Sequence, residues 1–233
     1  MTDLVIIAAQ MNMTNQKKPN YLLFGIGIAV FSMGLGIVLW TLLFGPGKST
    51  DLPPDLAATY LPDGRPVVGV QMTDHNNQPF DESHFKGKWS FLFFGFTHCP
   101  DVCPAALLVM KAVWNKLPEE ARQSPEPQMI FVSVDPDRDT PEIIKQYVKF
   151  YHPEFIGITG KHDKLDILTT QVSALYGYED AEGGDGYTVS HSAQIILIDP
   201  DGHMRAVFNT PHNIDKIVKG FVAIRNYHKG ISQ

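Results

Sequence analysis

The sequence predicts an α/β fold with a mixed central sheet, flanking helices and one N-terminal transmembrane helix. Apolar strand segments alternate with helical segments from about residue 67 onward, and the chain closes with a hairpin pattern and a last helix. An uncharged apolar segment, residues 21–44, precedes this region. With 44% hydrophobic and 19% charged residues among 233, the chain can build a sizeable core. The net charge of −6 argues against a nucleic-acid partner.

Residues 21–44 are the predicted anchor, because as a helix they reach roughly 36 Å, enough to cross a bilayer. A cleaved signal peptide is the alternative, but no Ala-x-Ala-like site follows Phe44. Lys17 and Lys18 place residues 1–20 in the cytoplasm by the positive-inside rule. We therefore expect a single pass through the inner (cytoplasmic) membrane with the globular domain on the periplasmic side, or the equivalent topology in the mitochondrial inner membrane.

Residues 45–66 are rich in proline and poor in apolar side chains, which predicts an extended linker that holds the domain off the membrane. The globular domain is placed at residues 67–233. Its first elements are a strand at 67–72, a polar turn at 73–79 and a short helical piece at 81–85.

The middle of the chain alternates strands and helices. Trp89 to Gly95 is a Phe-rich apolar run bounded by glycine, which is typical of a buried strand. A helix at 104–117 follows, with Pro104 at its first position. Beyond it the pattern predicts a strand at 129–134, a helix at 141–151 with Thr140 as N-cap, a strand at 155–159 and a helix at 163–176.

The last part begins with an acidic, glycine-rich stretch, residues 179–186, which we expect to be a mobile loop. Strands at 193–198 and 205–208 flank the tight turn Asp199–Gly202 and predict a hairpin. A helix at 213–227 ends the domain.

Both cysteines of the chain lie in one short turn between the strand at 89–95 and the helix after it. Cys99 and Cys103 thus stand near a helix N-terminus, whose partial positive charge would lower a thiol pKa. The pair is either structural (buried thiols or a disulfide) or it is reactive or metal-binding. A bridge across so short a loop restricts the unfolded chain little, so the second alternative is favoured.

Three stretches together resemble the Sco/SenC family, and the resemblance covers roughly residues 67–225. They are Gly95–Pro104 with both cysteines, the Asp-Pro-rich Val134–Glu142, and Val189–Ser192. Members of this family are membrane-anchored, thioredoxin-like copper proteins that help assemble the copper centre of cytochrome c oxidase. The resemblance therefore implies a thioredoxin-like copper-binding domain over residues 67–233.

The resemblance also implies a copper site made by Cys99, Cys103 and His191. Ligand chemistry agrees, because two thiolates and one imidazole form a soft set that suits copper, including Cu(I). A structural zinc site would normally need a fourth protein ligand; the chain has no third cysteine, although one of its nine histidines could supply that ligand. His98 is the nearest rival of His191, but it adjoins Cys99, and adjacent side chains of an extended segment point apart.

The Asp-Pro-rich stretch holds three carboxylates, at Asp135, Asp137 and Asp139, without the spacing of a calcium loop. We expect them to cap the next helix and to pair with Arg138. Asp135 follows an apolar strand directly, so we expect it near the copper, in the outer coordination sphere. The other histidines are interpreted as ordinary surface residues: His75, His84, His152, His162, His203, His212 and His228.

Two functions fit this pattern. The first is a copper metallochaperone that helps build the CuA centre of cytochrome c oxidase subunit II, receiving Cu(I) or Cu(II) from an upstream copper donor. The second is a thiol–disulfide oxidoreductase that reduces the cysteines of that subunit before metallation, with Cys99 and Cys103 as a redox disulfide. Redox relatives usually carry Cys-x-x-Cys, whereas three residues intervene here, so we expect a copper-binding protein rather than an enzyme. A thiol peroxidase on the same fold is a weaker third alternative.

Overall fold

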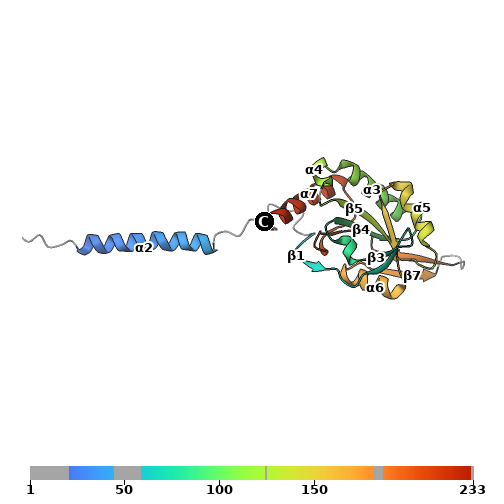
Figure 1. Ribbon diagram of the computed structural model, residues 1–233, viewed down its shortest axis with the longest axis horizontal. Coiled ribbons are helices and arrows are strands. Elements are labelled where there is room, and N and C mark those ends of the chain that lie inside the picture. The colour runs from blue at the N-terminus through green and yellow to red at the C-terminus, as the bar shows by residue number, and fades with distance from the viewer. Residues whose placement is uncertain (1–20, 45–58, 124, 181–185, 232–233) are drawn as a thin grey trace, which may run out of the picture. The chain divides into compact units, whose positions relative to one another are not determined.

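The structure, a computed structural model, describes residues 21–44, 59–123, 125–180 and 186–231 (Figure 1). The chain divides into two units, residues 1–50 and 51–233, and each is described by itself. In the first unit, α2 (Tyr21–Phe44) is a helix of 24 residues. Within the ranges described, no helix combines the length and the apolar character that a membrane crossing requires. The membrane anchor stays a prediction.

The second unit is built on an eight-stranded mixed sheet with the strand order β1-β10-β9-β4-β5-β6-β2-β3. At its centre β4 (Trp89–Gly95), β5 (Pro127–Ser133) and β6 (Ile156–Thr159) run parallel. Every residue of β4 and β5 is buried, because helices cover both faces, and this explains the unbroken apolar runs in their sequences. The expected α/β class with a mixed central sheet is confirmed.

Antiparallel strands complete the sheet on both sides of this centre. On one side β9 (Ile195–Ile198) pairs with β4, β10 (His203–Phe208) with β9, and β1 (Tyr60–Pro66) with β10. On the other side β2 (Gln71–Asp74) pairs with β6, and β3 (Pro79–Asp81) pairs with β2. The strand expected at 67–72 thus begins later, at Gln71, and the expected polar turn at 73–79 includes the end of β2 and the first residue of β3.

The helices cover the two faces of the sheet. In Figure 1, α3 (Val102–Lys116), α5 (Pro141–Tyr151) and α7 (Ile214–Ile231) lie together on one side, with the short α4 (Glu119–Arg122) near them. The opposite side carries α6 (His162–Gln171).

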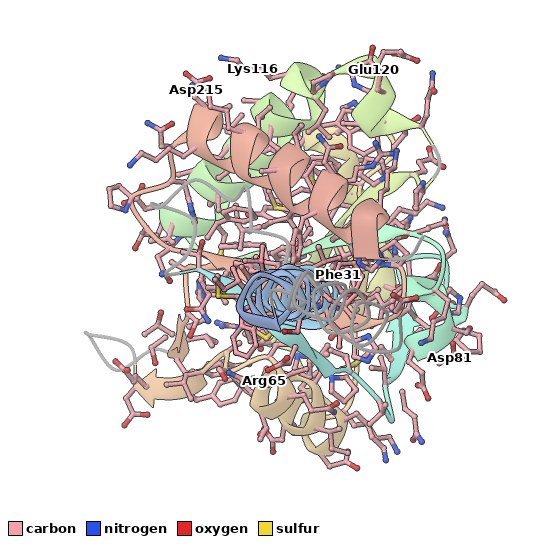
Figure 2. All side chains as sticks on the ribbon, turned by 90° about the vertical axis from the view of Figure 1, so that its left-hand side faces the viewer. Phe31, Arg65, Asp81, Lys116, Glu120 and Asp215 are labelled. Carbon is pink, nitrogen blue, oxygen red and sulfur yellow. The ribbon has the colours of Figure 1, made fainter. Side chains whose placement is uncertain are left out.

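Local contacts fix several of these helices. Figure 2 shows Lys116 of α3 close to Asp215 of α7, and the two side chains form an ion pair. Thr140 is the N-cap of α5 as predicted, since its hydroxyl accepts from the Ile143 N–H at 3.4 Å. A 3₁₀ helix, η1 (Glu82–Phe85), occupies the expected short helical piece.

Residues 60–66, which the sequence pattern placed in the extended linker, form strand β1 instead. Proline lacks an N–H, so a strand with Pro62 and Pro66 is tolerated at the edge of a sheet, where β1 lies. Tyr60 is buried, and its ring centroid lies 5.7 Å from that of Tyr227 in α7. The ordered domain therefore begins by residue 60, and the rest of the expected linker, residues 45–58, lies outside the described residues.

A second sheet of two strands, β7 (Tyr176–Asp180) and β8 (Tyr187–His191), is the other departure from the expected elements. The sequence pattern predicts a helix as far as residue 176, whereas α6 ends at Gln171. Residues 179–180 and 187–191 are strand, and residues 181–185 of the expected mobile loop lie outside the described residues. These strands are largely exposed, so they lack the apolar alternation that reveals a strand in a sequence.

Candidate metal centre

The two cysteines lie at the carboxyl end of the central strand β4. After Gly95 the chain turns through a loop, and α3 begins at Val102, two residues before the predicted start. Cys103 therefore belongs to the first turn of α3, whereas Cys99 lies in the loop. The backbone N–H of Cys103 donates to the Sγ of Cys99 at 3.4 Å. A thiolate at Cys99 would thus meet an unused N–H of the helix N-terminus, as the sequence suggested.

His191 reaches the same place from the end of β8. Its Nε2 lies 3.2 Å from the Sγ of Cys103, which is 88 residues away in the chain. Its Nδ1 lies 3.2 Å from the Ser192 carbonyl oxygen. A carbonyl oxygen only accepts, so Nδ1 carries the proton and the lone pair of Nε2 faces the thiol. The tautomer with a lone pair on Nε2 is the one that a metal ligand needs.

Two phenylalanines hold the imidazole of His191 in this orientation. The ring centroids of Phe93 and Phe96 each lie 5.9 Å from the imidazole, at interplanar angles of 87° and 82°. Phe93 comes from β4 and Phe96 from the cysteine loop. The same Phe-rich run that forms the central strand therefore also builds the apolar wall of the site.

Burial controls the protonation of both contacting groups. Cys103 is fully buried, and desolvation, the largest cause, raises the pKa of its thiol far above the usual value. Desolvation also lowers the pKa of His191, although its contact with the Ser192 carbonyl acts in the opposite direction. The metal-free pair at neutral pH is thus a neutral thiol beside a neutral imidazole, and a thiophilic metal would displace the thiol proton on binding.

The geometry of the three donors fits one metal ion. The donor atoms of Cys99, Cys103 and His191 all lie within 4.8 Å of one another. Ligands that share a metal at about 2.3 Å are about 4 Å apart in a trigonal arrangement, so small side-chain shifts would close this set around an ion. Within the described part of the chain, no other His, Cys, Asp or Glu joins this group. Two sulfurs and one nitrogen without a fourth protein ligand suit Cu(I) better than structural zinc.

Asp135, expected in the outer coordination sphere, is fully buried. Its carboxylate accepts from the Nε of Arg138 at 2.5 Å and from the hydroxyl of Tyr187 at 2.7 Å. The expected pairing with Arg138 is therefore present. Both carboxylate oxygens of Asp135 bind these partners, so its described hydrogen bonds join it to Arg138 in its own loop and to Tyr187 in β8, and not to a metal donor atom. Its place in the outer coordination sphere stays a prediction.

Asp139 makes the contact with the cysteine loop that the sequence interpretation missed. Its buried carboxylate accepts from the backbone N–H of Thr97 at 2.8 Å, from the Thr97 hydroxyl at 2.6 Å and from the Ser133 hydroxyl at 2.6 Å. The expectation that Asp139 caps the next helix is wrong, because Thr140 does so. The sequence did offer a sign of this contact: Asp139 is an acidic residue directly before the N-cap Thr140, in a turn that follows a buried strand.

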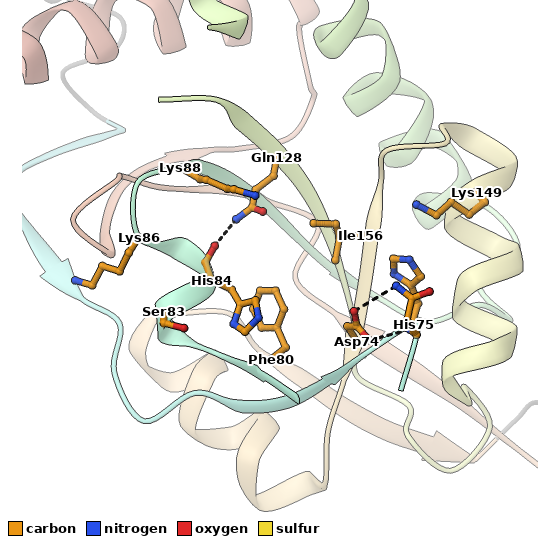
Figure 3. Close-up of a pocket in the computed structure, with 11 residues that line it drawn as sticks. Asp74, His75, Phe80, Ser83, His84, Lys86, Lys88, Gln128, Lys149 and Ile156 are labelled. Atoms are coloured by element: carbon orange, nitrogen blue, oxygen red, sulfur yellow. Dashed lines mark hydrogen bonds between the residues drawn. The ribbon is translucent and has the colours of Figure 1, made fainter. Parts of the chain in front are cut away.

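His98 behaves as expected for a neighbour of the site. Its side chain is 55% exposed, its Nδ1 lies 3.2 Å from the Thr97 hydroxyl, and it is not among the three converging donors. The expectation for His75 is wrong, since this residue is only 6% exposed. Its Nδ1 accepts from the Gly157 N–H at 2.9 Å, and desolvation lowers its pKa. His75 and Lys149 are among the residues that line a cavity of about 370 Å³. Figure 3 shows these two side chains near each other at one end of it.

Four further histidines were expected at the surface but are partly buried; one is His152, whose ring centroid lies 5.5 Å from that of Trp114. His212 contacts the Ala193 carbonyl through Nε2 at 2.8 Å, and His228 lies 3.3 Å from the Asp201 carboxylate. His203 is held beside the Asp199 carboxylate, at 3.7 Å. The surface expectation is therefore wrong for these four, whereas His84 and His162 are exposed as expected.

Asp199, Asp201 and His228 form a second group of metal-type donors, at the β9–β10 turn. The buried Asp199 carboxylate accepts from Arg205 through Nε at 2.9 Å and through Nη2 at 2.5 Å. Its other oxygen accepts backbone N–H groups of residues 201 and 203. A guanidinium already neutralises the charge that a cation would need, so this group is a structural ion pair at a turn.

A family model described as SCO1/SenC matches residues 68–225. A protein of Stutzerimonas stutzeri named as a candidate copper-binding protein is 38% identical over 155 residues, which cover 66% of this chain and 74% of that protein. The mitochondrial protein SCO1 homolog 1 of Arabidopsis thaliana is 36% identical over 149 residues, 64% of this chain and 44% of its own length. The chain thus spans less than half of that mitochondrial relative.

Solved structures agree with the observed fold. The crystal structure of Arabidopsis thaliana ScoI with copper bound has a TM-score of 0.62 and 31% identity, and the match covers 69% of this chain and 99% of that one. The solution structure of apo Sco1 from Thermus thermophilus has a TM-score of 0.61 and 32% identity, with 71% and 94% covered. The fold of residues 60–231 is therefore the thioredoxin-like α/β fold that the resemblance implied.

Proposed function

This chain belongs to the SCO1/SenC family, and from that premise we propose that it is a membrane-anchored copper metallochaperone whose cargo is held by Cys99, Cys103 and His191. The observation that carries the proposal is the convergence of two sulfurs and one imidazole nitrogen within 4.8 Å. A similar protein has been solved with copper bound, and another is named for copper binding. The resemblance to this family implies that the copper is delivered to the CuA centre of cytochrome c oxidase subunit II, and that an upstream donor protein supplies it.

The exposure of the donors suits transfer of the metal to another protein. Cys103 is fully buried, whereas Cys99 and His191 are partly exposed. A partner can therefore reach the metal from the side of Cys99 and His191 and replace one ligand at a time. Cys103, sealed beneath them, would be the last bond to break.

A thiol–disulfide oxidoreductase is the second function, because both cysteines are free thiols in one turn. Disulfide exchange needs a thiolate, and the raised pKa of the Cys103 thiol opposes that role. Cys99 would have to be the attacking group. This difference between the two thiols favours metal binding as the main role, with reduction of a partner's cysteines as an additional one.

The anchor is part of the same proposal. Residues 21–44 carry no charge, and the described apolar side chains of α2 are exposed, among them Phe31, Met33 and Trp40. Side chains of this kind need a nonpolar environment. We place residues 1–20 on the cytoplasmic side and the thioredoxin-like domain on the periplasmic side of the inner membrane.

The test is a copper titration of the full chain in detergent, with a Cu(I) chelator as competitor. Replacing Cys99 or Cys103 by Ser should abolish tight Cu(I) binding, because thiolates are the strong ligands for this ion. His191→Ala should weaken Cu(I) binding and remove most Cu(II) binding, since Cu(II) favours nitrogen ligands. His98→Ala is the matched control and should keep both. Loss of Cu(II) in His98→Ala with retention in His191→Ala would show that the ligand assignment is wrong.

A further inference from the structure

The Asp-Pro-rich loop between β5 and α5, residues 134–140, contacts both segments that carry the metal donors. Arg138 is its central side chain. We call Asp135, Arg138 and Tyr187 the brace, because these residues join the loop to strand β8, on which His191 lies. Arg138 is not one of the three metal donors, so its contacts need an explanation other than metal binding.

Arg138 binds the β8 segment in three ways. Its Nη1 donates to the Tyr187 carbonyl oxygen at 2.9 Å, and its guanidinium carbon lies 3.9 Å from the centroid of the Tyr187 ring. Through Nε it binds Asp135, whose other oxygen accepts from the Tyr187 hydroxyl. The backbone and the side chain of Tyr187 are thus both held, and β8 runs from this residue to His191.

The same loop holds the cysteine segment. The guanidinium carbon of Arg138 lies 5.7 Å from the centroid of the Phe96 ring, which in turn packs against the imidazole of His191. One residue further, Asp139 accepts from the backbone and the hydroxyl of Thr97, two residues before Cys99. The loop therefore sets the distance between the two ligand-bearing segments.

The hairpin that carries His191 needs such support. β7 and β8 form a two-stranded sheet that is not hydrogen-bonded as strands to the eight-stranded sheet. A two-stranded hairpin alone is at best marginally stable in water. A hydrogen bond from the Ser192 N–H to the Leu175 carbonyl closes the base of the hairpin itself, and one from the Tyr178 hydroxyl to the Val134 carbonyl joins the hairpin to the rest of the domain. The second of these also ends on the loop that carries the brace.

We propose that Arg138 is a positioning residue, which holds His191 at its distance from Cys103 by fixing β8 to the cysteine loop. The expected effect on copper binding rests on the proposed copper site. The positioning of His191 by Arg138 concerns only residues of this chain. Without the brace, both thiols keep their places while the imidazole loses its fixed orientation. The site then behaves as a two-thiolate site with a weakly held nitrogen ligand.

The experiment compares three variants of the full chain in detergent. Arg138→Met removes the hydrogen bonds and the stacking, and Arg138→Lys keeps the charge but not the planar fork. Arg205→Met is the matched control, because Arg205 also pairs with a buried aspartate, at the β9–β10 turn. That turn adjoins Ile198, which pairs with Ser90 near the start of β4, whereas the cysteines follow the end of β4. Copper affinities and the nitrogen hyperfine coupling of bound Cu(II) are measured for each variant.

We expect Arg138→Met to lose roughly 10–100-fold in Cu(II) affinity, the usual effect of removing a residue that orients a metal ligand. Its Cu(II) spectrum should lose the imidazole coupling, its Cu(I) affinity should fall less, and Arg138→Lys should lie in between. Arg205→Met should keep the wild-type spectrum even if it is less stable. A wild-type spectrum in Arg138→Met, or the same loss in Arg205→Met, would overturn the proposal.

A copper-free measurement separates this inference from the proposed function. In the metal-free chain, Arg138→Met and Arg138→Lys should both speed hydrogen exchange of the amides of residues 187–191, while exchange in β4 stays as in the wild type. If the wild type binds no copper but this exchange pattern appears, the function fails and the brace stands. Unchanged exchange in β8 of both variants contradicts the brace, whatever the copper result.

Discussion

Gly95 lies so close to Cys103 that a Cβ at residue 95 would come within 2.6 Å of the Cys103 Sγ. The last residue of the central strand and the buried thiol therefore share one space. Any side chain at residue 95 must move the sulfur or the strand. The same Cβ would also lie 3.0 Å from the Phe131 ring and 3.2 Å from the Phe93 ring, so an added methyl group is crowded on several sides.

We therefore expect Gly95→Ala to weaken copper binding and to destabilise the domain by about 1–3 kcal/mol, the usual cost of overpacking. Copper competition and urea unfolding would measure the two effects. Gly177→Ala is the control: it lies near the site in β7, but its Cβ would meet only the Ser190 hydroxyl, at the ordinary distance of 3.4 Å. Equal copper affinity in Gly95→Ala and wild type would show that the sulfur position does not limit binding.

Cys99 and Cys103 should form a reversible disulfide. Both are free thiols, and their sulfurs belong to a donor group that spans at most 4.8 Å. A small movement of the loop is enough to bring them to bonding distance. Mild oxidation should remove both thiols from a thiol assay, and a dithiol reductant should restore them. Cu(I) should then bind only the reduced form, so equal binding by the oxidised form would contradict the dithiolate site.

The buried His75 predicts a pH dependence of stability. Desolvation lowers its pKa in the folded state, while in the unfolded chain it titrates near 6.5. Below pH about 6.5 the unfolded state therefore binds more protons, and the free energy of unfolding falls as the pH falls, until the lower folded pKa is passed. For this one group the slope is at most about 1.4 kcal/mol per pH unit.

His75→Gln should reduce that slope, measured by urea unfolding between pH 7.5 and 5. Glutamine keeps an acceptor for the Gly157 N–H but cannot be protonated in this range. His84→Gln, at an exposed histidine of η1, is the matched control and should follow the wild type. An identical pH slope in His75→Gln and wild type would mean that His75 titrates alike in both states.

The proposed topology predicts the side of the membrane on which fused reporters work. Reporters active only outside the cytoplasm should be active when fused just before Tyr60 and after Gln233, and inactive after residue 20. The reason is the uncharged segment 21–44 behind Lys17 and Lys18. Cytoplasmic activity of both distal fusions would exclude the anchor in this orientation.

The sequence by itself determined the elements whose apolar pattern is strong. β4 and α5 have the predicted bounds, since a strand buried on both faces reads as an unbroken apolar run and a helix with Thr140 and Pro141 at its start is marked chemically. The cysteine pair was equally easy to recognise as a candidate site, because both thiols lie on one short stretch of chain. The family resemblance added His191, which spacing alone could not select from nine histidines.

Tertiary structure alone decided which residues surround those donors. β7 and β8 are largely exposed strands, and β1 is a proline-containing edge strand. None of the three therefore shows a periodic apolar pattern in the sequence. The contacts of Asp139 with Thr97 and of Arg138 with Tyr187 join segments 42 and 49 residues apart. Which residues these side chains contact depends on where the sheet places each loop, and a local sequence pattern does not contain that information.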